Sequence, residues 1–167
     1  MRRLKELRLV DDEAYAEKIY RTMRRSCSSK KDIARRLKEE GISPSVISGC
    51  ISSIGDDDLP FAIKKAMRYQ KGTGGKSLSY QKKTIYNKLI KDGFDDLDAQ
   101  KALSSLDFSF AQSRQGDILK NELEKVLRRY QRKYSGNDLY IRILRNLTAK
   151  GFSKEDISVA YHEMEGE

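Results

Sequence analysis

The sequence predicts an all-α fold, built as an elongated and curved tandem array of three three-helix repeats. The first observation behind this prediction is an internal repeat, in which isoleucine, leucine and glycine recur at intervals of four residues, the spacing of one helical face. The second is that no stretch of useful length alternates apolar and polar residues as a strand does. The repeated frame is Ile33-x-x-x-Leu37-x-x-x-Gly41, Ile85-x-x-x-Leu89-x-x-x-Gly93 and Ile143-x-x-x-Leu147-x-x-x-Gly151.

Each frame predicts two helices that meet at a short corner. Gly41, Gly93 and Gly151 follow the last apolar residue of a helix by one turn, where the chain needs the left-handed conformation that glycine adopts without strain. Two residues later, a serine or an aspartate is placed to accept hydrogen bonds from the first N–H groups of the next helix. The predicted helix pairs are 30–40 with 44–54, 79–91 with 96–106, and 138–150 with 154–164.

A further helix is predicted before each pair. Its start is marked in the first two repeats by a shared phrase, Asp11-Asp12-x-x-Tyr15-Ala16 and Asp57-Asp58-x-x-Phe61-Ala62. Asp12 and Asp58 are expected to cap this helix, and Tyr15 and Phe61 are expected to pack. The third repeat lacks the phrase, and its first helix is predicted to be longer, over 117–134.

The same frame predicts how the chain divides. Repeat 1 covers 1–55, repeat 2 covers 56–109 and repeat 3 covers 110–167. Residues 1–9 have the pattern of the end of a helix that belongs to a preceding repeat. The sequence is therefore expected to be an N-terminally trimmed form of a longer chain.

Composition limits the classes of protein to consider. The 167 residues carry 34 Lys and Arg against 25 Asp and Glu, a formal net charge of +9. No apolar run approaches the ~20 residues of a membrane span, and the N-terminus lacks the apolar core of a signal peptide, so a cytoplasmic location is expected. Two cysteines, Cys27 and Cys50, and one histidine form neither a disulfide framework nor a four-ligand zinc site. No metal and no cofactor is expected.

Three patterns resemble catalytic motifs, and a structural explanation is favoured for each. Residues 72–77 end in Gly-Lys-Ser like a phosphate-binding loop, but Gln70 stands where that loop needs glycine, and no apolar strand precedes it. Acidic runs at 11–12, 56–58 and 95–98 fall at helix starts, where capping and the helix dipole account for them. His162 has no acid or thiol near it in sequence. No catalytic residue is assigned and the chain is predicted not to be an enzyme; magnesium-dependent nuclease activity on the acidic runs is the alternative.

Basic residues recur near the corresponding corner of successive repeats. An isolated run of this kind is ordinarily a solvated face, but the recurrence favours a polyanion or an acidic protein groove as the partner. No recognition-helix signature accompanies these residues, so sequence-specific reading of DNA is not predicted. The predicted contact residues are Arg24, Arg25, Lys30, Lys31, Arg35, Lys64, Lys65 and Lys83.

The acid-pair phrases, together with the corners Leu37-x-x-x-Gly41-Ile42, Leu89-x-x-x-Gly93-Phe94 and Leu147-x-x-x-Gly151-Phe152, resemble the RecX family of bacterial regulators of the RecA recombinase. The resemblance covers essentially the whole chain and implies a fold of tandem three-helix repeats. It also implies a non-enzymatic regulator of DNA repair, homologous recombination and the SOS response. Such a regulator lies in the groove of the RecA filament on single-stranded DNA and typically inhibits RecA.

Several readings stay open beside this resemblance. A sequence-independent DNA-binding protein that acts without RecA is the alternative function. Inhibition and stimulation of RecA both fit the sequence, as do contacts to DNA, to RecA or to both. A monomer is expected.

Overall fold

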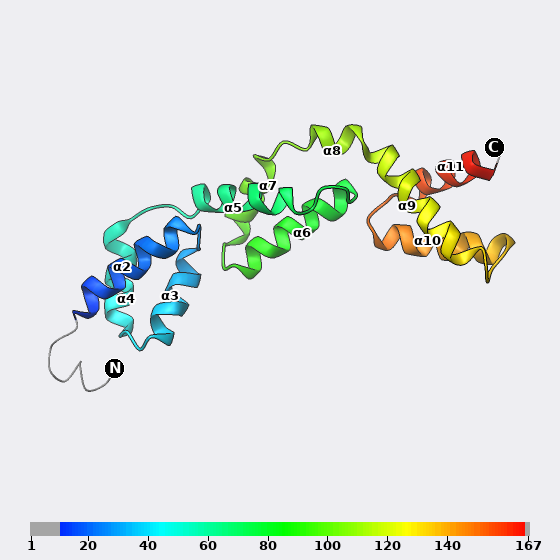
Figure 1. The fold of residues 1–167 in the computed structure, drawn as a ribbon. Coiled ribbons are helices and arrows are strands. Elements are labelled where there is room, and N and C mark those ends of the chain that lie inside the picture. The colour runs from blue at the N-terminus through cyan, green and yellow to red at the C-terminus, as the bar shows by residue number, and fades with distance from the viewer. Residues whose placement is uncertain (1–10, 166–167) are drawn as a thin grey trace. The chain divides into compact units, whose positions relative to one another are not determined.

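The computed structural model describes residues 11–165, and every regular element in that range is a helix (Figure 1). The all-α fold class is confirmed for this range, and the helix end expected at 1–9 lies outside it. The predicted elongation and curvature of the array stay predictions. The helices are α2 (Asp12–Arg25), α3 (Lys30–Glu39), α4 (Pro44–Ile54), α5 (Leu59–Lys71), α6 (Leu78–Lys91), α7 (Asp96–Ser104), α8 (Ser109–Ser113), α9 (Gln115–Tyr130), α10 (Gly136–Ala149) and α11 (Lys154–Glu165).

The three corners share one backbone geometry. Gly41, Gly93 and Gly151 have φ values of 80°, 86° and 85°, which lie in the left-handed region. At each corner the N–H of the next residue donates to the carbonyl of the frame leucine, the bond that defines a Schellman helix end. The N···O distances are 3.1 Å for Ile42 to Leu37, 3.1 Å for Phe94 to Leu89, and 3.2 Å for Phe152 to Leu147. The helices that flank the corners begin and end within two residues of the predicted bounds.

The chain divides into two compact units, each described by itself. The first unit contains the described residues up to Tyr69 together with Tyr86–Leu106. In this unit α2, α3 and α4 contact one another, as the blue to cyan helices of Figure 1 show. Each helix turns one apolar face inward, because its buried residues are spaced at helical intervals. The core that they form is Ala16, Tyr20, Ile33, Leu37, Ile42 and Ile47.

The second unit contains Gln70–Ile85 and the described residues from Asp107 onward. Here α9 packs against α10 and α11, and the core includes Leu123, Ile143 and Ile157. Glu122 on α9 accepts hydrogen bonds from Lys150 at 2.8 Å and from Lys125 at 2.9 Å. These two bonds lower the pKa of Glu122 to about 2 and so favour the charged carboxylate that holds the end of α10 to α9.

The helix predicted over 117–134 is shorter and is preceded by an unpredicted one. The structure has the single turn α8 and then α9, which ends at Tyr130. Beyond Tyr130 the chain forms a turn, and the ring of Tyr134 packs edge-on against that of Tyr130 with centroids 6.2 Å apart. The guanidinium carbon of Arg142 lies 3.8 Å from the centroid of the Tyr134 ring. The contact of Tyr134 with Tyr130 of α9 and its contact with Arg142 of α10 both accompany the turn.

The acid pairs do not cap as predicted. Asp11, and not Asp12, is the N-cap of α2, and its carboxylate accepts from the N–H groups of Glu13 and Ala14 at 3.0 and 3.2 Å. Asp12 lies in the first turn, where the helix dipole favours an acid. Asp58 directly precedes α5, but its carboxylate accepts hydrogen bonds from Arg24 and from the N–H of Lys30 rather than from the start of α5. Tyr15 packs against the core of the first unit.

A joint in the first unit holds the start of α3 to the corner at Gly93. Ser29, the N-cap of α3, donates its hydroxyl hydrogen bond to the carbonyl oxygen of Asp92 at 2.6 Å. Both carboxylate oxygens of Asp58 lie 3.2 Å from the backbone nitrogen of Lys30, the first residue of α3. A Cβ atom added to Gly93 would lie 2.7 Å from the Ser29 hydroxyl oxygen. This joint therefore needs glycine for space as well as for its backbone conformation.

A joint in the second unit has the same construction. Ser77, just before α6, donates its hydroxyl hydrogen bond to the carbonyl oxygen of Lys150, next to Gly151. The side-chain oxygen of Gln115 accepts from the N–H of Leu78, the first residue of α6, at 3.0 Å. Gln115 thus accepts from the first N–H of α6 as Asp58 accepts from the first N–H of α3, although the segment before α9 lacks the acid-pair phrase.

Candidate functional site: a basic groove

Arg24 is not the exposed contact residue that its place in a basic run predicts. Its side chain is only 6% exposed. Its guanidinium lies against the Phe61 ring, with the central carbon 4.2 Å from the ring centroid. The groups that accept hydrogen bonds from it are the carboxylate of Asp56 at 2.7 and 3.1 Å, the Tyr20 hydroxyl at 3.2 Å, the Ser28 carbonyl at 2.9 Å, and the carboxylate of Asp58.

Hydrogen bonds decide the charge states in this network. Burial alone would raise the pKa of Asp56, but the hydrogen bonds from Arg24 and Tyr20 outweigh burial and lower that pKa. Burial likewise works against the charged form of Arg24, yet its bonds to Asp56, Asp58 and Tyr20 raise the pKa of the guanidinium. Burial and the hydrogen bond to Asp56 raise the pKa of Tyr20 to about 12. At neutral pH the network therefore consists of a cation, an anion at Asp56 and a neutral tyrosine.

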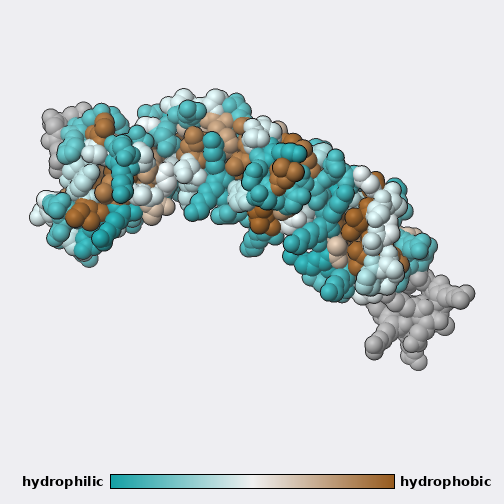
Figure 2. All heavy atoms as spheres, turned by 180° about the vertical axis from the view of Figure 1, so that it is seen from behind, coloured by the Kyte–Doolittle hydropathy of each residue, from teal (hydrophilic) through white to brown (hydrophobic). Residues whose placement is uncertain are grey.

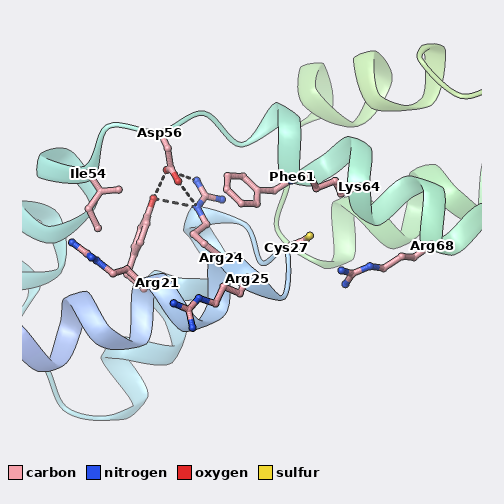
Figure 3. Close-up of a pocket in the computed structure, with 10 residues that line it drawn as sticks. Arg21, Arg24, Arg25, Cys27, Ile54, Asp56, Phe61, Lys64 and Arg68 are labelled. Atoms are coloured by element: carbon pink, nitrogen blue, oxygen red, sulfur yellow. Dashed lines mark hydrogen bonds and ion pairs between the residues drawn. The ribbon is translucent and has the colours of Figure 1, made fainter.

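A groove opens beside this network in the first unit, with a volume of about 520 Å³. Residues of the Arg24 network, with Cys27 and Ile54, line one part of it. Four exposed cations from two helices line the rest, Arg21 and Arg25 from α2 and Lys64 and Arg68 from α5. Figure 3 shows Arg24 turned toward Asp56, whereas the guanidinium groups of Arg25 and Arg68 lie apart from that network. We call these four residues, with the groove that they border, the basic groove.

The four cations differ in the ion pairs and hydrogen bonds that they already form within the protein. Arg21 pairs with Glu17 one turn earlier on α2, and Arg68 donates to the Ser26 carbonyl at 3.4 Å. Arg25 and Lys64 form no ion pair with any residue that the structure describes. The groove therefore offers a ligand at least two unpaired cationic groups, beside two others held only by exposed or long contacts.

Arg25 and Lys64 are among the contact residues predicted from the sequence, whereas Arg21 and Arg68 are not. A signal for the two omitted residues exists, because Arg21 precedes Arg25 by four positions and Arg68 follows Lys64 by four. That interval puts each pair on one helical face. The meeting of the two pairs across α2 and α5 depends on tertiary packing, which the interval does not specify.

The structure separates the remaining predicted contact residues. Lys65 turns inward, where it pairs with Asp92 at 3.1 Å and lies 5.9 Å from the centroid of the Phe94 ring. Lys30 is half-buried at the start of α3. Lys31 and Arg35 are exposed on α3 beside a different groove, and Lys83 is exposed in the second unit.

The segments that resemble catalytic motifs have structural roles here. In the loop at 72–77, Thr73 and Ser77 are buried, and the Ser77 hydroxyl belongs to the second joint. Cys27, expected in an exposed basic loop, is instead buried with a φ of 63°, just after the end of α2. Among the residues described, no group of three or more His, Cys, Asp or Glu side chains could hold a metal ion.

None of the helices between 11 and 165 is both long and apolar enough to span a membrane.

The basic groove can bind anionic groups. Guanidinium groups form paired hydrogen bonds with phosphate or carboxylate, and an ammonium group acts as a mobile point charge. On the face shown in Figure 2, hydrophilic side chains predominate, and hydrophobic ones appear as separate patches between them. Hydrophilic residues, more than an extended apolar surface, therefore cover this face.

Comparison with known proteins identifies relatives over most of the chain. No protein-family model matches the sequence. A regulatory protein RecX from Lactococcus lactis subsp. cremoris (strain SK11) is 31% identical over 164 residues, which cover 96% of this chain and 61% of that protein. A regulatory protein RecX from Halalkalibacterium halodurans is 29% identical over 160 residues, covering 94% and 60%. The chain thus spans about three fifths of the length of these curated relatives.

Solved structures agree in fold. The crystal structure of RecX from Lactobacillus salivarius aligns with a TM-score of 0.63 at 23% identity, over 93% of this chain and 97% of that one. A second crystal structure, of a regulatory protein RecX, aligns with a TM-score of 0.59 at 21% identity, over 91% and 72%. The chain is therefore similar in sequence to regulatory proteins RecX over nearly its whole length and shares the fold of RecX crystal structures.

Proposed function

We propose that this chain is a non-enzymatic regulator of the RecA recombinase, acting mainly as an inhibitor, and that it binds in the groove of the RecA filament on single-stranded DNA. Similarity to proteins named regulatory protein RecX supports a regulatory role. The resemblance of the acid-pair phrases and corners to the RecX family implies RecA as the partner. The observation that carries the proposal is the basic groove, where Arg25 and Lys64 stand unpaired beside Arg21 and Arg68. These cations complement the phosphate groups of single-stranded DNA and the carboxylate groups of acidic side chains.

Inhibition has a direct physical basis in this proposal. A filament repeats the same anionic groups along its length, so one chain with several cationic contacts bridges neighbouring copies. Such a bridge resists the subunit movements that accompany growth, ATP hydrolysis and strand exchange. The chain itself performs no chemical step.

The test is ATP hydrolysis by RecA on saturating single-stranded DNA, titrated with this chain. We expect suppression below one chain per RecA subunit. The triple variant Arg25→Glu, Lys64→Glu, Arg68→Glu should need about tenfold more protein for the same suppression, because each reversal replaces an attraction with a repulsion. Arg24 is kept, since its loss would damage the fold.

The matched control reverses three exposed cations elsewhere, Arg129→Glu, Arg132→Glu and Lys133→Glu, with the same change in net charge. It should suppress hydrolysis as the parent chain does. Equal loss in both triple variants would show that total charge, and not the basic groove, makes the contact. Undiminished suppression by the groove variant, with helicity intact, would exclude the groove as the contact surface.

A sequence-independent DNA-binding protein that acts without RecA is the second candidate, because the same four cations are sufficient to bind phosphates. Fluorescence anisotropy on a labelled oligo(dT) strand distinguishes the two functions. Suppression of hydrolysis at concentrations where the naked strand is unbound supports the RecA regulator. Tight binding to the naked strand, without an effect on hydrolysis, supports the second candidate.

A further inference from the structure

A second groove in the first unit has a different character from the basic groove. It lies between α3, α4 and the end of α6, with a volume of about 810 Å³. Four of its lining residues are apolar, namely Ala34, Pro44, Ile47 and Ile90. Ile90 is 40% exposed although it is a large aliphatic residue. We call this the α3–α4 groove.

Cations border the α3–α4 groove on two sides. Lys31, Arg35 and Lys38 follow one another on α3 at intervals of four and three, which puts them on one face, and Lys91 ends α6. All four are exposed. Lys31, Lys38 and Lys91 form no ion pair within residues 11–165.

The two carboxylates that line the same groove are already engaged by the protein. Asp32 pairs with Arg35. Asp92 pairs with Lys65 at 3.1 Å and accepts a hydrogen bond from the Tyr69 hydroxyl. The three unpaired lysines therefore have no neutralising acid among the lining residues, and an excess of positive charge surrounds the apolar floor.

The chemistry of the floor separates two kinds of anionic partner. Single-stranded nucleic acid is held by aromatic side chains on which bases stack, and no aromatic residue lines the α3–α4 groove. An aliphatic floor bordered by cations instead complements an aliphatic side chain flanked by carboxylates. This combination is the charge and shape complement of an acidic peptide.

We propose that the α3–α4 groove binds an acidic peptide segment of a partner protein, in which a leucine-like residue lies on Ile47 and Ile90 and flanking Asp and Glu residues pair with Lys31, Lys38 and Lys91. This site is separate from the cations of the basic groove. It does not depend on the identity of the partner proposed above, so the two proposals can fail independently.

The test uses the full 167-residue chain and labelled synthetic peptides, without RecA or DNA. The probe is fluorescein-Gly-Asp-Glu-Asp-Leu-Glu-Leu-Asp-Glu, measured by anisotropy at about 0.15 M salt. Two companion probes replace both leucines with glycine, or every acid with lysine. We expect the leucine probe to bind about tenfold more tightly than the glycine probe, and the lysine probe not to bind. Equal affinity of the leucine and glycine probes would overturn the apolar part of the proposal.

Variants locate the site. Lys31→Glu, Lys38→Glu, Lys91→Glu together should weaken the leucine probe at least about tenfold, whereas the triple reversal in the basic groove should leave its affinity unchanged. Ile90→Ser should bring the leucine probe close to the affinity of the glycine probe while preserving the melting temperature. Loss of affinity in the basic-groove variant alone would overturn the assignment.

Two other occupants are distinguished in the same series. Oligo(dT) binding that disappears in the α3–α4 groove variant, with no peptide binding by the parent chain, would overturn the proposal in favour of nucleic acid. A dimer in sedimentation equilibrium that the same variant dissociates would overturn it in favour of a second copy of the chain.

Discussion

Arg24 connects three helices of the first unit through two carboxylates. Its guanidinium extends from α2 to Asp56 and Asp58, which precede α5. Asp58 in turn accepts from the N–H of Lys30 at the start of α3. A cation removed from such a partly buried site leaves two carboxylates close together without compensation, which costs far more than the loss of one hydrogen bond.

The substitution Arg24→Met should therefore lower the free energy of unfolding by roughly 2–4 kcal/mol. Arg25→Met removes the same charge from the adjacent exposed position and should change stability by about 0.5 kcal/mol or less. Urea unfolding followed by circular dichroism measures both variants. Similar losses in the two would show that the Arg24 network contributes little to the fold.

The sequence itself indicates that the Arg24 side chain points into the core. Arg24 follows the buried residues Ala16 and Tyr20 at intervals of eight and four, so it continues the core face of α2. A count of positive charges in the segment does not reveal which side of the helix each residue occupies. The acceptors of Arg24 could not be predicted in the same way, because Asp56 and Asp58 come from a segment more than thirty residues away.

At the scale of elements, the two joints explain how a helix start is held against a distant corner. A serine hydroxyl serves as donor to the corner carbonyl and as acceptor for its own helix, since Ser29 also accepts from the N–H of Asp32 at 3.1 Å. The glycine next to that carbonyl leaves space for the hydroxyl. Stability at these joints therefore depends on the close approach of the serine hydroxyl to the corner, as well as on the backbone conformation of the glycine.

Gly41 and Gly93 separate these two requirements. Both have positive φ, so alanine at either position incurs a strain of roughly 1–2 kcal/mol. At Gly93 the new Cβ atom also meets the Ser29 hydroxyl, whereas at Gly41 no described atom lies within 4 Å of it. Gly93→Ala should therefore destabilise by about 1–2 kcal/mol more than Gly41→Ala, as measured by urea unfolding.

The double variant Ser29→Ala, Gly93→Ala provides the control for that prediction. Removing the Ser29 hydroxyl relieves the contact, so the double variant should lose less stability than the sum of the single variants. Strict additivity would mean that the contact between the two residues does not cause the extra loss.

Helix bounds were predictable and the joints were not, for a physical reason. Capping and left-handed glycines act between residues a few positions apart, so α3, α4 and α6 were placed to within two residues. The helix over 117–134 was wrong at its end, where Tyr134 lies in a turn and its ring contacts Arg142 of α10. The bond from Ser29 to Asp92 spans 63 positions, and no local pattern encodes it.

At the scale of the whole molecule, the formal charge of +9 attracts any polyanion without saying where it binds. Counter-ion release distinguishes a diffuse field from defined contacts, because each phosphate contact with single-stranded DNA contributes about −0.7 to the slope of log K against log salt. The four cations of the basic groove together predict a slope of about −3 if all of them contact phosphates.

The variant Lys64→Gln should make that slope less negative by about 0.7, because it removes one ammonium from the groove and leaves the fold intact. Lys133→Gln removes the same charge from an exposed position in the second unit and should leave the slope unchanged. Anisotropy of labelled oligo(dT) across a salt series measures both. If the two variants shift the slope equally, the total charge of the chain, and not the basic groove, binds the strand.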